Sequence, residues 1–555
     1  MLALIAHPYD PDLETNIQGP PYPFGDALDL DGSMTFSVIG GETVVYMADT
    51  AYTTAPSDTP ANTHFPAVLL TPFSYEEKLF EGMEPEGRTQ GGFGDIVIAN
   101  GAARDGTAWL DDKLHLGWDG RDLLLYRGQP GAAFSTFELV AKLTCDGLEW
   151  NEDTVSLRLR NGQAAFEQPI DRPRYGGTGG TDGGSDLAGK GMPVALGHKP
   201  FNVSPVLVDA ANLIYQFHHG TNTATYPLPG TFSVRDKGVG LSLEAGFDGG
   251  ESYGSLISDP PAAGEFSYSM VSGLIGLGAS PDGRVTCTPD VGTEPPVAIT
   301  PATLGEIIEV LVTEYMGAGN FADTRLDTAA FAQLDADYPH PIGYYVGPDE
   351  EPSAGEILDR LMGGARGYWR VRLDGTFTLG LLAAPSGTAD HTIDASEIEG
   401  PIRRLHCMPS WSRKIGYRRN WTVQSADEIA SSVAADDRAL YAALYTYAPV
   451  EDQALRNAHL LARDVTVESY LTGTDAATNA ATEAARQQAL FGTERDIYEI
   501  DVVGDPFGFE LGELVDITGV TRFGWSDPKK LRIIGRSVDD PGDGFTARVT
   551  LRLWG

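Results

Sequence analysis

The chain has 555 residues and a net charge of −39, from 39 Lys and Arg against 78 Asp and Glu. Such an acidic surface argues against a nucleic-acid-binding protein, because binding DNA requires cations that neutralise phosphates. The charge either serves solubility or lines a channel that DNA must pass without sticking. A content of 66 Gly and 36 Pro is typical of a turn-rich chain with many short strands.

Three cysteines, Cys145, Cys287 and Cys407, lie far apart in the sequence. No Cys-x-x-Cys pair is present, so we expect no zinc or iron–sulfur site and no disulfide scaffold. The N-terminus lacks the basic region of a signal peptide, and no apolar run reaches the ~18 residues of a membrane helix. We therefore expect a soluble protein, made in the cytoplasm, with no membrane segment, no metal and no cofactor.

The first elements expected along the chain are short strands. Apolar runs at 34–39 and 43–46 predict irregular β structure, and Gly91–Ile98 predicts a further strand. Asp-Gly pairs at 119–120 and 146–147 each stand between alternating apolar runs. This arrangement is typical of a type I′ hairpin turn, so we expect two adjacent hairpins in an antiparallel barrel or sandwich. The run 155–159 should place Val, Leu and Leu on one face.

Helices are expected mainly after residue 300. Thr303 precedes apolar positions that repeat every 3.6 residues, and 353–364 predicts a second, short helix. Residues 425–447 predict a helix that opens with the capping box Ser425-Ala-Asp-Glu428. Residues 475–491 predict an Ala-rich helix with Asp475 as its N-cap. Strands are also expected at 203–220, around a third Asp-Gly turn at 374–375, and at 498–504, 511–519, 530–538 and 547–555.

This order of elements predicts a mainly β chain with inserted helices (α+β) and several β-barrel or sandwich domains. We expect an irregular β region at 1–100, a β-hairpin barrel domain at 101–170 and a β domain after a Gly-rich connector at 171–300. An α+β insertion with a helix and a hairpin should follow at 301–400, and a C-terminal α+β barrel domain at 401–555.

The stretch GSDLAGKG at 184–191 resembles a phosphate-binding loop. The position that should hold Mg²⁺ through a Ser or Thr is Gly191, and Pro193 and Pro200 follow where a helix should begin. We reject nucleotide binding on these grounds. We expect instead a mobile or close-packed connector, which lets the backbone pass tightly by another chain or subunit and orders on assembly.

No catalytic, cofactor-binding or metal-binding residues are predicted, and we expect no enzyme. The acidic pairs Asp111-Asp112, Glu76-Glu77 and Glu350-Glu351 could suggest a glycosidase, whose two carboxylates face each other across ~5–10 Å. Adjacent strand residues point to opposite faces, however. His218-His219 lacks the third ligand that a zinc site needs, and there is no Gly-x-Ser-x-Gly elbow.

Glycan binding without catalysis is an alternative. Aromatic side chains that could stack on sugars are Trp118, Trp150, Tyr344, Tyr345, Tyr368 and Trp369. Most of them alternate with apolar residues in strand patterns, which favours packing in the core. An exposed Trp next to an Asp-Gly turn would favour the glycan interpretation.

Short motifs are spread over the second part of the chain. Between residues 172 and 220 they read Tyr-x-Gly, Gly-Lys-x-x-Pro-x-x-x-Gly, Asn-Val-x-Pro-Val-Leu-Val and Tyr-Gln. Their positions are Tyr175, Gly177, Gly189, Lys190, Pro193, Gly197, Lys199, Pro200, Asn202, Val203, Pro205, Val206, Leu207, Tyr215 and Gln216. GYRRNWTVQ stands at 416–424, and LGELVDITG precedes a terminal TLRLWG. Over residues 90–555 this pattern resembles tail baseplate hub proteins of long, non-contractile-tailed (siphophage-type) bacteriophages.

The resemblance implies a virion structural protein at the tail tip or baseplate. It implies a ring of tail-tube-type β-barrel domains, usually trimeric, through which DNA leaves without being specifically bound. The expected partners are further copies of the chain, distal tail or tube proteins, the tape-measure protein and receptor-binding fibres. Some such hubs carry an iron–sulfur cluster on clustered C-terminal cysteines, which this chain lacks. The alternative is a tail-associated protein that binds glycan or hydrolyses glycan or peptidoglycan.

Overall fold

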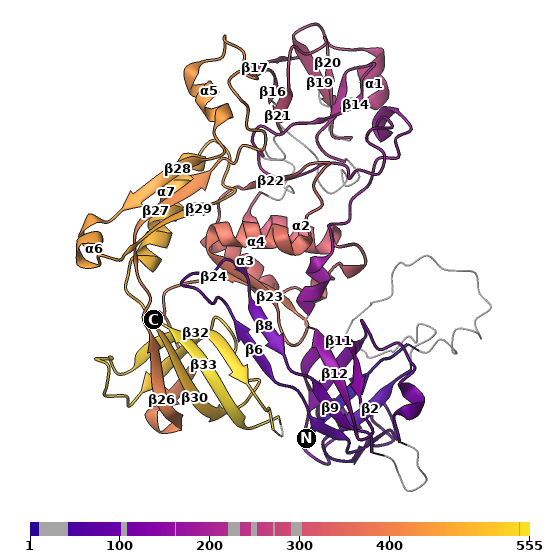
Figure 1. The fold of residues 1–555 in the computed structure, drawn as a ribbon, viewed down its shortest axis with the longest axis vertical. Helices are drawn as coiled ribbons and strands as arrows, with labels where there is room; N and C mark the ends of the chain where they lie inside the picture. The colour runs from indigo at the N-terminus through magenta and orange to yellow at the C-terminus, as the bar shows by residue number, and fades with distance from the viewer. Residues whose placement is uncertain are drawn as a thin grey trace, which may run out of the picture.

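The computed structural model describes residues 1–9, 43–101, 108–160, 162–219, 233–245, 252–269, 272–289, 302–542 and 544–555. The strand predicted at 34–39 lies outside these residues. The fold is mainly β with inserted helices, as expected, and its strands form multiple sheets, including a curled half-barrel (Figure 1). Among the described helices, none has the length and apolar content needed to cross a membrane.

Seven strands form the N-terminal sheet, at the lower right of Figure 1. In spatial order they are β2 (Val45–Ala48), β1 (Leu2–Ala6), β10 (Asp122–Arg127), β11 (Glu138–Trp150), β12 (Thr154–Arg160), β9 (Ile96–Ala99) and β5 (Leu69–Thr71). A short pair, β3 (Tyr52–Thr53) and β4 (His64–Phe65), lies beside it. The strand β1, second from one edge of this sheet, is buried along its whole length, because all five of its side chains are apolar.

Both hairpins predicted in this region are wrong. The residues before Asp119 form a 3₁₀ turn and a loop, and the side chain of Trp118 packs in the core. The alternation of apolar and polar residues in this stretch therefore reflects burial of single side chains and not a β-strand. Asp146-Gly147 is a β-bulge inside the long strand β11. The turn to β12 lies at 151–153, where the Asn151 side-chain oxygen accepts the backbone N–H groups of Asp153 and Thr154 at 2.8 and 2.9 Å.

The C-terminal sheet, at the lower left of Figure 1, contains the four strands predicted at the end of the chain. In spatial order it consists of β25 (His391–Asp394), β31 (Leu514–Thr518), β32 (Lys529–Val538), β33 (Ala547–Trp554), β30 (Ile497–Gly504) and β26 (Ile398–Leu405). Two strands from far upstream join it: β6 (Tyr75–Lys78) pairs with β32, and β8 (Gln90–Phe93) pairs with β6. One continuous cluster of buried apolar residues fills the space beneath both the N-terminal and the C-terminal sheets.

Five of the described helices lie across the middle of the molecule and along its left side in Figure 1, where α6 stands at the edge. They are α2 (Leu304–Glu314), α3 (Thr328–Asp337), α4 (Ala354–Ala365), α6 (Gln453–Ala458) and α7 (Ala476–Phe491). The strands among them are β13 (Val194–Gly197), β22 (Gly343–Val346), β7 (Gly87–Arg88), β23 (Gly367–Val371), β24 (Phe377–Leu381), β27 (Ser410–Tyr417), β28 (Thr446–Glu451) and β29 (Arg463–Glu468).

The local signals for α2, α4 and the third hairpin are confirmed. Thr303 caps α2 in a capping box with Glu306, and Ser353 caps α4. Gly375 takes φ +86° in the turn between β23 and β24. The helix predicted at 425–447 is wrong for most of its length. Ser425 and Glu428 make their hydrogen bonds in a turn, and only α5 (Ala435–Ala442) is helical before β28 begins.

Two small sheets lie at the top of Figure 1. One contains β14 (Val206–Asp209), β15 (Ile214–Gln216), β20 (Leu274–Leu277), β19 (Glu265–Ser269) and β18 (Ser242–Leu243); the other contains β17 (Val239–Gly240), β16 (Ser233–Asp236) and β21 (Val285–Thr288). The helix α1 (Tyr253–Ser258) contacts the first of them.

Residues 75–93 connect the parts of the molecule. The segment contributes β6 to the C-terminal sheet and β7 to the middle sheet, where Gly87 pairs with Tyr368. Strand pairing thus crosses the predicted boundaries, because the first hundred residues supply strands to four sheets. Two buried carboxylates fix this segment: Glu77 bonds Arg536 at 2.7 Å, and Glu84 lies among three arginines.

Candidate functional site

The Gly-rich loop is closed by its own hydrogen bonds. The Asp182 carboxylate accepts the backbone N–H of Gly176 at 2.7 Å and the hydroxyl of Thr178 at 2.6 Å, and these bonds lower its pKa. The backbone N–H of Tyr175 donates to the carbonyl of Lys190 at 3.0 Å, which joins the two ends of the loop. The loop is therefore a compact element of the fold in the single chain.

A buried arginine explains the glycine at 191. Arg172, whose side chain is fully buried, donates to the carbonyl oxygens of Met192 and Gly347, both at 3.0 Å. A Cβ at Gly191 would lie 2.4 Å from its Nε. Lys190 pairs with Asp349 at 2.9 Å, and the strand β13 follows where a nucleotide-binding loop would start a helix. The glycine-lysine pattern thus reflects close packing.

Residues shared with the hub motifs meet in buried hydrogen bonds. Asn202 Nδ2 donates to Asn420 Oδ1 at 3.0 Å and to the carbonyl of Thr422 at 2.8 Å. Asn420 and Asn202 are 218 positions apart in the chain and almost fully buried. Tyr175 Oη donates to Gln216 Oε1 at 2.6 Å in the same way. We call the contact of Asn202 with the 416–424 stretch the asparagine junction.

Two further features stabilise the asparagine junction: the backbone conformation of Asn202 and the hydrogen bonds that Asn420 donates. Asn202 adopts a left-handed φ of +56°, which Asn tolerates better than most residues. Asn420 Nδ2 donates to the carbonyl oxygens of Tyr441 and Ala443 at 2.7 and 3.0 Å, which secures the end of α5. The junction therefore holds the upper sheets against the α5–β28 region.

His218 and His219 are buried and do not form a metal site with a third ligand among the described residues. His218 Nδ1 accepts the backbone N–H of Ala195 at 3.2 Å, and His219 Nε2 lies 2.9 Å from Tyr315 Oη. Burial lowers the pKa of His218 to about 3 and that of His219 to about 4. Both rings therefore pack as neutral groups.

One group of potential metal ligands occurs in the described part of the chain, His406 with Glu494 and Asp496. Arg404 Nη2 already lies 2.5 Å from Asp496, and His406 Nδ1 lies 2.9 Å from the same carboxylate. The Arg404 guanidinium thus already lies where a metal ion would bind the Asp496 carboxylate. These residues form an ion-pair cluster on the C-terminal sheet.

The acidic pairs do not face each other across a cleft. Asp111 accepts from the Asn100 amide while Asp112 pairs with Lys113. Glu76 is exposed and pairs with Lys78, whereas Glu77 is buried with Arg536. Glu351 receives two bonds from Arg174, at 2.8 and 3.0 Å, while Glu350 accepts the N–H of Gly347.

The aromatic candidates divide into two groups. Four pack in the core, which confirms that interpretation for Trp118, Tyr344, Tyr345 and Trp369. Trp150 is 60% exposed at the end of β11. Tyr368 is half-buried and lines a cavity.

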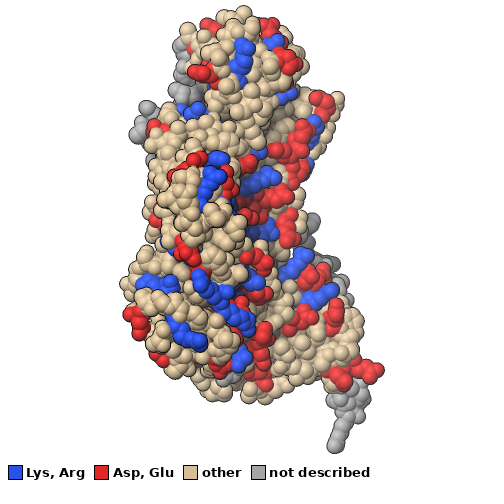
Figure 2. Space-filling model, turned by 60° about the vertical axis from the view of Figure 1, so that its left-hand side comes forward, with Lys and Arg blue, Asp and Glu red and all other residues tan. Residues whose placement is uncertain are grey.

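Charged side chains on the face shown in Figure 2 are mixed: Asp and Glu form a band along the molecule, with Lys and Arg between them. Examples of such exposed pairs on the lower sheets are Arg548 with Glu399 and Arg403 with Glu499. The arginines that matter most to the fold, Arg172, Arg413 and Arg536, are buried and were not predicted. Their partners lie far away in sequence, so no local pattern could identify them.

No protein-family model and no curated protein matches the sequence. Solved structures of tail proteins are distantly similar. The 43 kDa tail protein of prophage MuSo2 from Shewanella oneidensis shares 12% identity at a TM-score of 0.35, over 88% of this chain and 96% of that one. The tail protein from Neisseria meningitidis MC58 shares 12% identity at a TM-score of 0.34, over 87% and 92%. A chain of the native gene transfer agent virion shares 11% identity at a TM-score of 0.39, over 71% and 92%.

Proposed function

We propose that the chain is a structural component of a bacteriophage tail baseplate, the hub that joins the tail tube to the receptor-binding tip. The proposal depends on one observation. The motif residues that resemble hub proteins converge in the buried asparagine junction and in the bond of Tyr175 to Gln216. The amide nitrogens of Asn202 and Asn420 donate buried hydrogen bonds, which define a unique packing and offer no reacting group to a substrate. The role of these residues is therefore architectural.

The hub assembles with further copies of itself, as a homotrimer around the tail axis, and contacts tube proteins, the tape-measure protein and receptor-binding fibres. It resides in the tail tip of the virion and catalyses no reaction. The net charge of −39 suits a wall of the DNA exit channel. DNA that passes carboxylates releases no counterions by binding them, so it slides.

The first test combines light scattering of the purified chain with assays for glycan and peptidoglycan hydrolysis. A trimer or larger ring without hydrolysis supports the hub. A monomer that cleaves glycan contradicts it. If the chain is a monomer that hydrolyses no glycan, its position in the virion is determined by electron microscopy with gold-labelled antibodies. Label at the tail tip supports the proposal, and label elsewhere overturns it.

A second candidate is glycan binding by a tail-associated protein. It is favoured by the exposed indole of Trp150 and by the cavity at Tyr368. Binding glycan and forming a hub are compatible, since the two would use different parts of the surface.

A further inference from the structure

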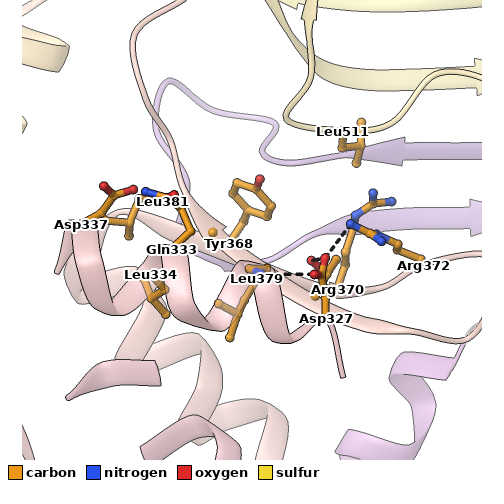
Figure 3. Close-up of a pocket in the computed structure, with 13 residues that line it drawn as sticks. Asp327, Gln333, Leu334, Asp337, Tyr368, Arg370, Arg372, Leu379, Leu381 and Leu511 are labelled. Carbon is orange, nitrogen blue, oxygen red and sulfur yellow. Dashed lines mark hydrogen bonds and ion pairs between the residues drawn. The ribbon is translucent and has the colours of Figure 1, made fainter. Parts of the chain in front are cut away.

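A polar cavity of about 220 Å³ lies between α3, the β23–β24 hairpin and the loop before β31 (Figure 3). Leu379, Leu511 and the ring of Tyr368 contribute apolar surface to its lining. Arg370 and Arg372 also line the cavity. It therefore combines an aromatic face with fixed polar groups, the combination by which proteins bind small polar ligands.

The polar groups of the cavity are held in place by the fold. Asp327 Oδ2 accepts Arg372 Nη2 at 2.6 Å and the hydroxyl of Thr378 at 2.9 Å (Figure 3). Arg370 is almost fully buried, and its Nη atoms bond Glu77 and Glu510. These side chains need not reorganise to receive a ligand, which reduces the entropic cost of binding.

Two donors on these residues have no acceptor among the described residues. The Nε atoms of Arg370 and Arg372 are buried and make no hydrogen bond. Burial, offset in part by nearby arginines, raises the pKa of Tyr368, so its hydroxyl keeps its proton. A buried donor without a partner costs about 1–3 kcal/mol. Both Nε atoms are enclosed by the protein, so the Nη groups of Arg372, whose side chain is 35% exposed, supply the donors that an occupant with oxygen acceptors would use.

Charge balance distinguishes between possible occupants. The three carboxylates of Glu77, Glu510 and Asp327 contact the three guanidinium groups of Arg370, Arg372 and Arg536. The cluster is therefore neutral overall and has no excess charge to attract a free anion. Neutral hydroxyl groups, which both donate and accept, suit it better than phosphate or a carboxylate.

The size of the cavity limits the ligand. It is smaller than the roughly 300–1,000 Å³ of sites for drug-sized molecules, so it suits a single ring. A neighbouring cavity of about 330 Å³ shares Asp337 and Leu381 with it and is lined further by apolar residues such as Leu382 and Leu490. This second space has room for the next part of an attached chain.

We propose that this cavity binds one neutral pyranose residue of a glycan, with its carbon–hydrogen face on Tyr368 and its hydroxyl groups toward Arg372. The inference is independent of the hub function, because it concerns binding by the single chain. It deepens the second candidate function, glycan binding, by assigning a ligand class to the cavity that Tyr368 lines.

Saturation-transfer NMR and calorimetry on the full-length chain test the proposal. The probes are glucose, galactose, N-acetylglucosamine, glucuronate and inorganic phosphate. At least one neutral sugar should bind saturably, and more tightly than glucuronate or phosphate. Binding of phosphate or glucuronate alone would indicate an anion site and would overturn the inference, as would the absence of saturable binding by any sugar.

Variants locate the site. Tyr368→Phe removes one hydrogen bond and keeps the ring, so affinity should fall about 2- to 13-fold, while Tyr368→Ala should abolish binding. Tyr447→Phe removes the hydroxyl of a 45% exposed tyrosine on β28 and is the matched control, with unchanged affinity expected. Gln333→Ala, at the exposed rim on α3, should weaken binding without affecting the core. If both Tyr368→Phe and Gln333→Ala bind like the native chain, the cavity is not the site.

Discussion

Replacing Glu84 with Gln should strongly destabilise the centre of the molecule. The Glu84 side chain is 4% exposed and receives Arg413 at 2.7 and 2.9 Å and Arg463 at 2.7 Å, while Arg366 Nε lies 3.1 Å away. Burial alone would raise the pKa of Glu84, but the three arginines outweigh it and hold the pKa below its ordinary value. The carboxylate is therefore the ionised centre of a cationic cluster.

The expected loss of stability follows from the arginine charges that stay buried when the Glu84 carboxylate is removed. Gln keeps the shape but presents an N–H₂ group to guanidinium donors, and removing one partner of a buried ion pair costs about 3–5 kcal/mol. For a cooperative unit of roughly 150–250 residues, 1 kcal/mol shifts Tm by about 2–4 °C, so we expect a shift of about 6–20 °C. Differential scanning calorimetry at pH 7 measures it.

Glu86→Gln is the matched control. The Glu86 side chain is 82% exposed and lies 3.8 Å from Arg366, so its loss should cost at most about 1 kcal/mol. Because the folded pKa of Glu84 is lowered, its stabilisation is present above the unfolded value of about 4.3 and declines as pH falls through the folded value. The difference in the free energy of unfolding between Glu84→Gln and the native chain should therefore decrease as the pH falls through the folded pKa of Glu84. Equal Tm values for the two variants at pH 7 would refute this reasoning.

Three further predictions concern the motif region. Gly191→Ala would place a Cβ 2.4 Å from Arg172 and should cost about 1–3 kcal/mol, whereas Gly92→Ala has open space and should cost less than 1 kcal/mol in urea unfolding. Asn202→Ala leaves the Thr422 carbonyl without its donor and puts Ala at φ +56°, so hydrogen exchange should accelerate between 416 and 424 and not in β33. His218 and His219, with folded pKa values of about 3 and about 4 against about 6.5 unfolded, stay neutral when the unfolded chain takes up protons. Each should lower the free energy of unfolding by about 1.4 kcal/mol per pH unit between 6.5 and its folded pKa, and their imidazole NMR signals should show no protonation at pH 5.

Local signals predicted those elements in which local and tertiary preferences agree. The capping box at Thr303 and the Asp-Gly turn at 374–375 lie at a helix start and a hairpin turn, as expected. The pair Asp146-Gly147 carries the same turn signal but lies in a bulge, because Asn151 supplies a better turn five residues later. A residue pair that allows positive φ thus permits a turn without requiring one.

The asparagine junction shows what the sequence could and could not reveal. The Asn202 and Asn420 motifs were identified from their resemblance to hub proteins, but their contact spans 218 positions and no periodicity predicts it. The same holds for Glu77 and Arg536, which are 459 positions apart. Side-chain pairs of this kind are determined by tertiary packing alone.

The placement of residues 75–93 has a consequence for biosynthesis. The strand β6 cannot pair with β32 until more than 300 further residues have been translated. Glu84 likewise cannot bond Arg413 and Arg463 before that point. Domains normally fold one after another as they emerge from the ribosome. This chain cannot complete its N-terminal half in that order, and loop closure over such a span is entropically costly. A nascent chain arrested before residue 529 would leave Tyr75 and Glu77, the buried side chains of β6, without β32 and Arg536, which makes such a fragment a natural substrate for chaperones.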